Sequence, residues 1–258
     1  MAAPSFIQEA ETAWNSTTSP KTTASFNVVA GDILVAFAAV ENGLEGSVAL
    51  THTGGAGMPF TAKQTLVPTP AGNWAWLWLW TSVVDSNKSM TVTFTRAGSN
   101  WFGGNVLTFR GSDGVGATSG TNTTGAPTLN LTTTQDNSAI VWALVDFAAA
   151  AGTRTARTAA GAFTSQTAFL DAAHYGVYGG YHADAGAIGT YAVGQSAPSG
   201  QTYAIAAVEI TGTAGGGGSP ADWLPRRGSF GQDARLRRHS IIVANMRDIV
   251  LCERSKAA

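Results

Sequence analysis

The sequence has little cysteine and little charge. Its 258 residues include one cysteine, Cys252, so no disulfide can form within the chain. Charged residues make up only 12% of the chain, about half of the usual share, so a soluble surface must be built from Thr, Ser, Asn and Gln. No apolar run approaches the length of about eighteen residues that a membrane-spanning helix needs. Residues 1–10 lack the basic residue that precedes the apolar stretch of a secretory signal. We therefore expect a protein that is made in the cytoplasm and enters no membrane.

Apolar residues and glycine, in contrast, are plentiful. Apolar residues make up 44% of the chain, which is enough for a sizeable core. Most of the 31 glycines fall between apolar runs, where turns need a positive φ. This pattern is typical of short strands joined by tight turns. Few segments have the apolar period of a helix, so the composition favours an all-β fold.

Short β-prone runs follow one another through the first 212 residues. Residues 33–40 form a continuous apolar run, which is the pattern of a strand buried on both faces, and residues 138–147 form another. Residues 89–95 (SMTVTFT) alternate between polar and apolar, which predicts a strand with one face in solvent. The sequence does not decide whether residues 148–161 form a helical turn or a loop. About a dozen strands with frequent turns predict an antiparallel, jelly-roll-like β-sandwich over residues 1–212.

The end of the chain differs from this sandwich. Residues 213–219 are a glycine-rich linker. Residues 219–258 hold eight basic and four acidic residues, a net charge of +4, whereas the preceding residues hold seven basic and twelve acidic ones, a net charge of −5. About forty residues cannot bury a core of their own, so we expect residues 220–258 to be an extended basic docking arm with an acidic partner. The predicted docking residues are Trp223, Leu224, Arg226, Arg227, Phe230, Arg235, Arg237, Arg238, Ile241 and Ile242.

A row of tryptophans lies in residues 74–84 (WAWLWLWTSVV). Four of them share one face of the predicted strand. Such a row can stack on sugar rings, or it can fill the space between two sheets packed about 10 Å apart. Because the other face of the strand is also apolar, we favour the core. The four tryptophans are Trp74, Trp76, Trp78 and Trp80. The other candidate glycan contacts are Trp101, Tyr178 and Tyr181.

Patterns for catalysis and metal binding are weak. His174, His182 and Asp184 have the same parity on a predicted strand. The two histidines lie about 26 Å apart along an extended strand, so they could share a metal only if the chain bends at Gly179-Gly180. The sequence contains no G-x-S-x-G motif, phosphate loop or dinucleotide fingerprint. We therefore predict no catalytic residue, no metal and no cofactor.

Paired carboxylates are the remaining route to an enzyme. Glycoside hydrolysis needs two of them on either side of the bond that is cleaved. Most of the acidic residues lie in predicted turns, where they are ordinary surface groups, and a polysaccharide-degrading enzyme stays a third alternative. The candidates are Glu9, Glu11, Glu41, Glu45, Asp85, Asp113, Asp136, Asp146, Asp171, Asp184 and Glu209.

Neither the glycine pairs nor the arginines indicate a nucleotide or a nucleic acid. Gly103-Gly104 and Gly179-Gly180 are interpreted as bulges or close strand contacts. The arginines at 235, 237 and 238 could bind phosphates, but no aromatic residues alternate with them. Carboxylate pairing in a protein interface is therefore the favoured use of this cluster.

Four stretches of the first 212 residues are distinctive in combination. They are residues 22–35 (TTASFNVVAGDILV), 89–114 (SMTVTFTRAGSNWFGGNVLTFRGSDG), 178–186 (YGGYHADAG) and 203–212 (YAIAAVEITG). Together they resemble uncharacterised β-rich proteins of tailed bacteriophages and prophages, over about residues 5–212. That resemblance implies a virion structural protein and brings no catalytic motif with it.

These observations favour a non-enzymatic virion protein, namely a capsid decoration, head spike or tail accessory protein, assembled in the host cytoplasm and anchored by its C-terminal arm. Its expected partners are other virion proteins and further copies of itself in a homo-oligomer. Neither a membrane nor a nucleic acid is an expected partner. The alternative is a carbohydrate-binding module that attaches to host surface glycans.

Overall fold

The computed structural model describes residues 2–41, 47–66 and 75–213. The chain divides into two units, Met1–Gly215 and Gly216–Ala258, and every element described here belongs to the first. The described residues form eighteen strands and no helix. They therefore contain no helix long and apolar enough to cross a membrane. The predicted all-β character with antiparallel sheets is confirmed.

The first half of the described chain contributes ten strands. They are β1 (Ser5–Glu11), β2 (Lys21–Thr22), β3 (Phe26–Val28), β4 (Ile33–Val40), β5 (Val48–His52), β6 (Thr61–Leu66), β7 (Trp76–Val83), β8 (Lys88–Met90), β9 (Val92–Arg96) and β10 (Phe102–Arg110). A five-stranded sheet has the order β1-β10-β4-β7-β6. The sheets β2-β9-β5 and β3-β8 form a second layer, and all pairs are antiparallel.

The second half contributes eight strands. They are β11 (Ser112–Gly125), β12 (Thr128–Thr132), β13 (Ala139–Asp146), β14 (Thr155–Ala156), β15 (Phe163–Leu170), β16 (Gly176–His182), β17 (Thr190–Ala197) and β18 (Gln201–Gly212). Another five-stranded sheet has the order β11-β18-β13-β16-β15, and the sheet β12-β17-β14 covers it. These pairs are antiparallel as well.

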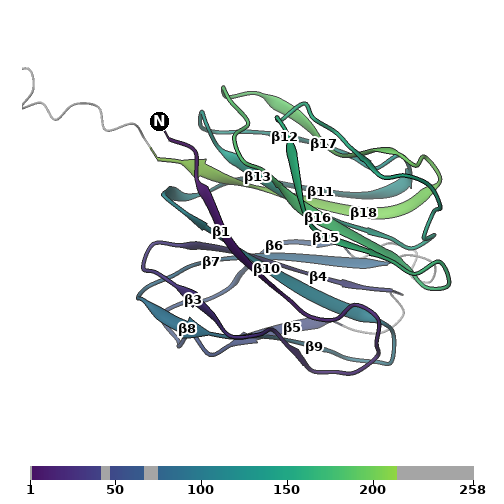
Figure 1. Cartoon of the computed structure of the whole chain (residues 1–258), viewed down its shortest axis with the longest axis horizontal. Coiled ribbons are helices and arrows are strands. Elements are labelled where there is room, and N and C mark those ends of the chain that lie inside the picture. The colour runs from purple at the N-terminus through teal and green to yellow at the C-terminus, as the bar shows by residue number, and fades with distance from the viewer. Residues whose placement is uncertain (1, 42–46, 67–74, 214–258) are drawn as a thin grey trace, which may run out of the picture. The chain divides into compact units, whose positions relative to one another are not determined.

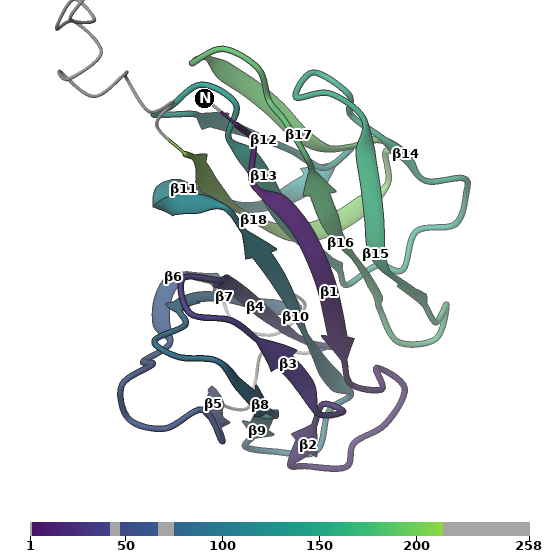
Figure 2. The same cartoon turned by 60° about the vertical axis from the view of Figure 1, so that its left-hand side comes forward.

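Three apolar cores separate four layers of sheet (Figure 1). The two five-stranded sheets face each other across the central core, which includes Phe37 and Leu107 of the first half and Val141 and Val208 of the second. The first outer core lies beneath β2-β9-β5 and β3-β8, and the second lies beneath β12-β17-β14. Both five-stranded sheets are therefore covered on both faces, as Figure 2 shows from another side.

The two halves repeat one arrangement. The strands β1, β10, β4, β7 and β6 correspond in order to β11, β18, β13, β16 and β15. The registers correspond too, since Ile33 pairs with Phe109 in the first half and Ala139 with Ile210 in the second, and all four lie in the central core. The edge strands β6 and β15 each carry a bulge at the corresponding position. The halves thus pack through equivalent faces, as the subunits of a two-fold dimer do.

Alternation of side chains explains the two buried apolar runs. Along Ile33–Val40 the odd-numbered side chains enter the central core and the even-numbered ones enter the first outer core. From Ala139 to Val145 the odd-numbered side chains again enter the central core. This is the behaviour of strands that are buried on both faces, and it confirms that prediction for both runs.

The glycine pairs lie where strands meet closely. A Cβ on Gly104 would lie 2.5 Å from the ring of Phe94, and a Cβ on Gly180 would lie 2.1 Å from the carbonyl oxygen of Thr164. Gly180 pairs with Trp142 of β13, whose ring stacks on Phe163 with centroids 4.4 Å apart. The interpretation of these glycines as close contacts is confirmed.

Candidate functional site

The predicted docking arm, residues 220–258, lies outside the described residues. This applies to all of its predicted docking residues, which are Trp223, Leu224, Arg226, Arg227, Phe230, Arg235, Arg237, Arg238, Ile241 and Ile242. The last described residue, Thr213, forms an antiparallel bridge with Ala2, and its backbone N–H donates to the Ala2 carbonyl oxygen at 3.1 Å. The described part of the chain therefore ends beside its own beginning.

The tryptophan row belongs to the core. Trp78 and Trp80 are 5% and 8% exposed, and Trp76 packs against the same first outer core. Trp74 lies outside the described residues. The core interpretation is confirmed for the three tryptophans that are described, and these offer no open platform for a sugar ring.

The other candidate glycan contacts do not share a surface. Tyr181 faces the central core and stacks on Phe6 with ring centroids 4.7 Å apart. Tyr178 faces the second outer core, where the guanidinium of Arg154 lies 4.6 Å from its ring centroid. Trp101 packs at the margin of the central core. The two tyrosines thus lie on opposite faces of β16, and no single ligand surface unites all three residues.

A ring and carboxylate cluster joins the halves beside Trp101. The imidazole of His174 lies flat on the indole, with centroids 3.7 Å apart and planes 10° apart. Its Nδ1 lies 3.0 Å from Oδ1 of Asp171, and this hydrogen bond lowers the pKa of Asp171. Glu41 accepts the backbone N–H of Trp101 at 3.1 Å. The cluster holds residues before β10 against residues before β16.

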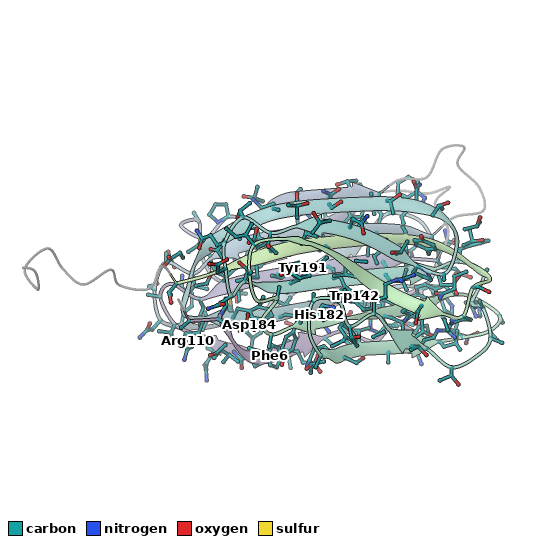
Figure 3. The ribbon with its side chains drawn as sticks, turned by 90° about the horizontal axis from the view of Figure 1, so that it is seen from above. Phe6, Arg110, Trp142, His182, Asp184 and Tyr191 are labelled. Carbon is teal, nitrogen blue, oxygen red and sulfur yellow. The ribbon has the colours of Figure 1, made fainter. Side chains whose placement is uncertain are left out.

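His182 is buried with both ring nitrogens engaged. Nδ1 lies 3.1 Å from the carbonyl oxygen of Gly161, and the indole N–H of Trp142 donates to Nε2 at 3.3 Å (Figure 3). Burial lowers the pKa of His182. Asp184, also considered as a metal ligand, accepts the backbone N–H of Gly186. Within the described ranges, no group of three His, Cys, Asp or Glu side chains is placed to hold a metal.

Two of the candidate carboxylates are buried and hold loops in place. Burial tends to raise the pKa of Glu209, but its hydrogen bonds outweigh burial, so the pKa is lowered. For Asp146, burial is the larger effect and the pKa is raised. The donors to Glu209 are the backbone N–H groups of Ala117, Thr134 and Gln135 and the hydroxyls of Thr134 and Ser138. The donors to Asp146 are the backbone N–H groups of Ala148, Ala150 and Thr202.

Glu9 and Glu11 lie near each other at the margin of the central core. Glu11 accepts the indole N–H of Trp14 at 2.6 Å and the hydroxyl of Thr167 at 2.8 Å. The buried amide of Asn105 donates to Thr167 at 2.7 Å and to Glu9 at 3.4 Å. Burial and the neighbouring Glu11 raise the pKa of Glu9 against the effect of the Asn105 bond. These contacts tie β1 of the first half to β15 of the second.

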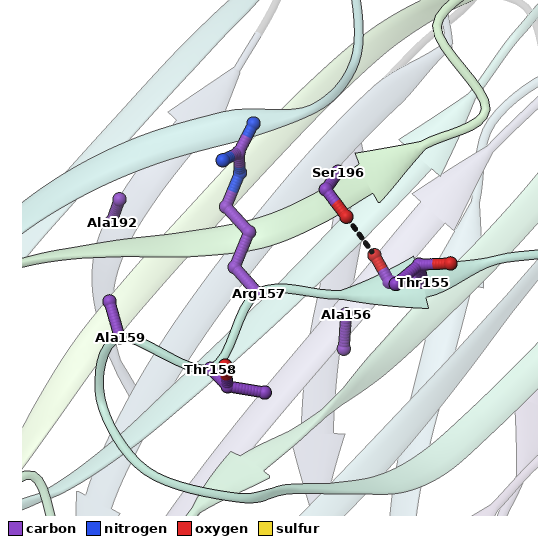
Figure 4. Close-up of a pocket in the computed structure, with 7 residues that line it drawn as sticks. All are labelled: Thr155, Ala156, Arg157, Thr158, Ala159, Ala192 and Ser196. Atoms are coloured by element: carbon purple, nitrogen blue, oxygen red, sulfur yellow. Dashed lines mark hydrogen bonds between the residues drawn. The ribbon is translucent and has the colours of Figure 1, made fainter.

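A hollow of about 440 Å³ opens on the outer face of β12-β17-β14 (Figure 4). Val193 of β17 faces the second outer core, so its neighbour Ala192 faces away from that core, into the hollow. Arg157 is the one charged residue of the lining, and its neighbours have small or hydroxyl-bearing side chains. The lining residues are Thr155, Ala156, Arg157, Thr158, Ala159, Ala192 and Ser196.

The hollow forms where the ladder between β14 and β17 is irregular. A register shift leaves Ser196 out of the ladder, and such bulges redirect side chains. The Ser196 hydroxyl donates to the carbonyl oxygen of Thr155 at 3.3 Å. The backbone N–H of Arg157 donates to the carbonyl oxygen of Gly194 at 2.9 Å, which holds the arginine alongside β17.

Arg157 differs in its charge environment from the other arginines of the described chain. Arg110 and Arg154 pair with buried aspartates, and Arg96 is itself buried. The Nε of Arg157 donates to the carbonyl oxygen of Pro127 at 3.4 Å. Among residues 2–41, 47–66 and 75–213, no acidic side chain forms an ion pair with its guanidinium.

Sequence reasoning missed this hollow. The sequence did not decide between a helical turn and a loop for residues 148–161, and no binding residue was predicted there. The distinguishing property of Arg157 is the absence of an acidic partner among the described residues, which becomes visible only when the partners of the other arginines are known. A hydroxyl-rich segment with two arginines, TRTART at 153–158, is the one local signal.

No known protein family, curated protein or solved structure matches this chain.

Proposed function

We propose that this chain is a non-enzymatic structural protein of a tailed-phage virion. It would be a capsid decoration, head spike or tail accessory protein, anchored to the particle by residues 220–258. The distribution of charge carries the proposal. Before residue 219 the chain has a net charge of −5, and two of its four arginines, Arg110 and Arg154, pair with its own aspartates. Residues 219–258, in contrast, have a net charge of +4 beside apolar side chains. A basic, partly apolar segment of this length fits docking on an acidic protein surface.

We infer that each half is a jelly roll. In the first half β1 pairs with β10, β10 with β4, and β4 with β7. In the second half β11 pairs with β18, β18 with β13, and β13 with β16. If β2 and β3 are counted as one strand and β8 and β9 as another, these are the first, last, third and sixth strands of each half. Jelly rolls serve viral capsid and lectin domains. This support is an analogy at the level of the fold, and it agrees with the resemblance of residues 5–212 to β-rich phage proteins.

Assembly would take place in the host cytoplasm and would present several copies on one particle. The proposed partners are other virion proteins, reached by the arm, and further copies of the chain in a symmetric homo-oligomer. The arginines at 235, 237 and 238 would orient the arm through carboxylate pairs, while Trp223 and Phe230 would supply buried area.

The proposal is tested by reversing the charge of the arm in the full chain. Arg235→Glu, Arg237→Glu and Arg238→Glu together should lower incorporation into particles at least about tenfold, since each lost interfacial charge pair costs more than about 1.4 kcal/mol. The measurement is the copy number of the chain in purified virions from a host that supplies wild-type or variant protein.

Lys63→Glu on β6 serves as the control, because it reverses a charge outside the arm. It should leave incorporation unchanged, and both proteins should keep the wild-type melting temperature. Normal copy number of the triple variant would overturn the anchoring role, and absence of the wild-type chain from virions would overturn the virion assignment.

The hollow at Arg157 favours a second candidate function, which is binding of host surface glycans. Hydroxyl groups and a cation on an outer sheet suit a polar ligand better than an apolar one. The two functions are compatible, because a protein displayed on a particle can also attach that particle to a cell.

A further inference from the structure

The Arg157 hollow has an unused capacity to bind an anion. Its guanidinium has five N–H donors, of which the structure engages the one on Nε, with the Pro127 carbonyl oxygen at 3.4 Å. The terminal amino groups have no acidic partner in the described part of the chain, while Arg110 and Arg154 are paired. A planar guanidinium of this kind recognises a carboxylate through two parallel hydrogen bonds.

The remaining lining suits a sugar. Thr155, Thr158 and Ser196 are exposed and have hydroxyl groups. Hydroxyls can exchange hydrogen bonds with those of a sugar, and Ser196, which donates to the Thr155 carbonyl oxygen, can still accept one. Ala156 and Ala192 add small apolar surfaces of the kind on which the C–H face of a sugar ring can rest. The volume of about 440 Å³ is enough for one or two sugar units.

We propose that the hollow binds the carboxylate-bearing unit of an acidic glycan, a uronic or sialic acid, with Arg157 on the carboxylate. This inference rests on the second candidate function and gives it a site and a ligand class. A single guanidinium matches the single negative charge of a carboxylate. A phosphate dianion is the poorer match, because the lining contains no second basic residue and the chain before residue 219 has a net charge of −5.

The affinity of one hollow is expected to be low. The lining contains no aromatic ring on which a sugar could stack, so a Kd on the order of 0.1–1 mM is expected. Several copies on one particle would raise the effective affinity when the glycan repeats along a chain or a cell surface.

The test uses the full chain and two matched pairs of probes. Trigalacturonate and sialyllactose carry carboxylates, while fully methyl-esterified trigalacturonate and lactose are their neutral counterparts. Saturation-transfer NMR and calorimetric titration should show binding of the carboxylated probes at least about tenfold tighter than binding of the neutral ones. Arg157→Gln should abolish this preference, and Arg157→Lys should keep only part of it because an ammonium lacks the planar fork.

Two further variants separate the site from general effects of charge. Lys63→Gln removes one cation from β6 in the other half and should leave binding unchanged. Ala192→Gln fills the hollow without removing the arginine, and it should weaken binding several-fold. Both should keep the wild-type melting temperature.

Each contrary result has a distinct meaning. A preference for carboxylated sugars that survives Arg157→Gln would overturn this site while leaving the glycan function standing. Failure of the wild-type chain to bind any of the four probes would overturn both. Inorganic phosphate that binds Arg157 more tightly than trigalacturonate does would overturn the ligand class.

Discussion

The imidazole of His174 lies flat on the indole of Trp101, with ring centroids 3.7 Å apart, and thereby joins the two halves of the chain. Asp171 holds the imidazole through Nδ1 at 3.0 Å. This stack lies at the margin of the central core, where residues before β10 meet residues before β16. It is a local contact between the two halves.

Removal of the His174 ring should weaken the contact between the two halves and so lower the stability of the fold. His174→Ala is expected to lower the free energy of unfolding by about 1 kcal/mol, the usual value of an aromatic pair beyond its buried area. His174→Phe keeps a planar ring and should recover part of that loss. Urea denaturation of the full chain provides the measurement, and equal stability of the alanine variant and the wild type would show that the stack contributes nothing.

The buried carboxylate of Glu209 should be among the most sensitive polar positions. Glu209→Gln replaces an acceptor of several hydrogen bonds by an amide that can accept fewer and brings its own donors near the N–H groups of Ala117 and Thr134. We expect a loss of about 3 kcal/mol, because charged hydrogen bonds are lost and buried donors are left unpaired.

The pH dependence of stability provides a second check on Glu209. Its folded pKa is lowered from 4.5, so its stabilising effect is present above about pH 4.5 and is lost as the pH falls through the folded pKa. The wild type should therefore lose stability below about pH 4.5 more steeply than Glu209→Gln does. Identical slopes for the two proteins in acid denaturation would contradict this assignment.

His182 should make the chain sensitive to acid at a higher pH. Burial lowers its folded pKa below the ordinary value of 6.5, so below about pH 6.5 the unfolded chain binds a proton that the folded chain does not bind, and stability falls with pH. Protonation would also bring an N–H of the ring against the indole N–H of Trp142. His182→Gln should flatten the stability profile just below pH 6.5, as followed by melting temperature, and an unchanged profile would show that His182 does not contribute to it.

The strands could be predicted because the pattern of polar and apolar residues within each short segment is enough to indicate a strand. The continuous apolar run of Ile33–Val40 follows from the burial of both faces of one strand. The alternation in residues 89–95 is confirmed as a burial pattern, but the single strand predicted there is divided at Thr91 into β8 and β9, which pair in different sheets. The order of the strands depends on partners far along the chain, and no local pattern reports it.

The internal repeat was missed because corresponding positions of the two halves hold different residues. Ala36 pairs with Trp80 in the first half, and Trp142 pairs with Gly180 at the corresponding place in the second. The large side chain has changed strands while the pair keeps one large and one small member. A comparison of the two segments residue by residue therefore finds little.

The candidate site was hidden for a similar reason. Trp101, Tyr178 and Tyr181 are prominent in the sequence, but burial decides whether an aromatic ring can meet a ligand, and both tyrosines are buried. Arg157 looks ordinary in the sequence, and it stands out only because Arg110 and Arg154 are paired with aspartates. Exposure and pairing both depend on the whole fold.

Gly180 offers the sharpest test of the close packing within the second half. A Cβ at this position would lie 2.1 Å from the carbonyl oxygen of Thr164 and 2.7 Å from the ring of Phe163. Because the first of these atoms belongs to the backbone of a paired strand, it cannot move without disturbing β15. Gly180→Ala should therefore lower the free energy of unfolding by about 3 kcal/mol, at the upper end of the usual cost of overpacking.

Gly200→Ala is the matched control, since an added Cβ there meets no atom within 4 Å. It should leave stability within about 0.5 kcal/mol of the wild type or raise it slightly by restricting the unfolded chain. Denaturant titration of both variants measures the difference. If Gly180→Ala proved as stable as Gly200→Ala, β15 and β16 would have room for a methyl group between them, and the close packing of Gly180 against Thr164 and Phe163 would be wrong.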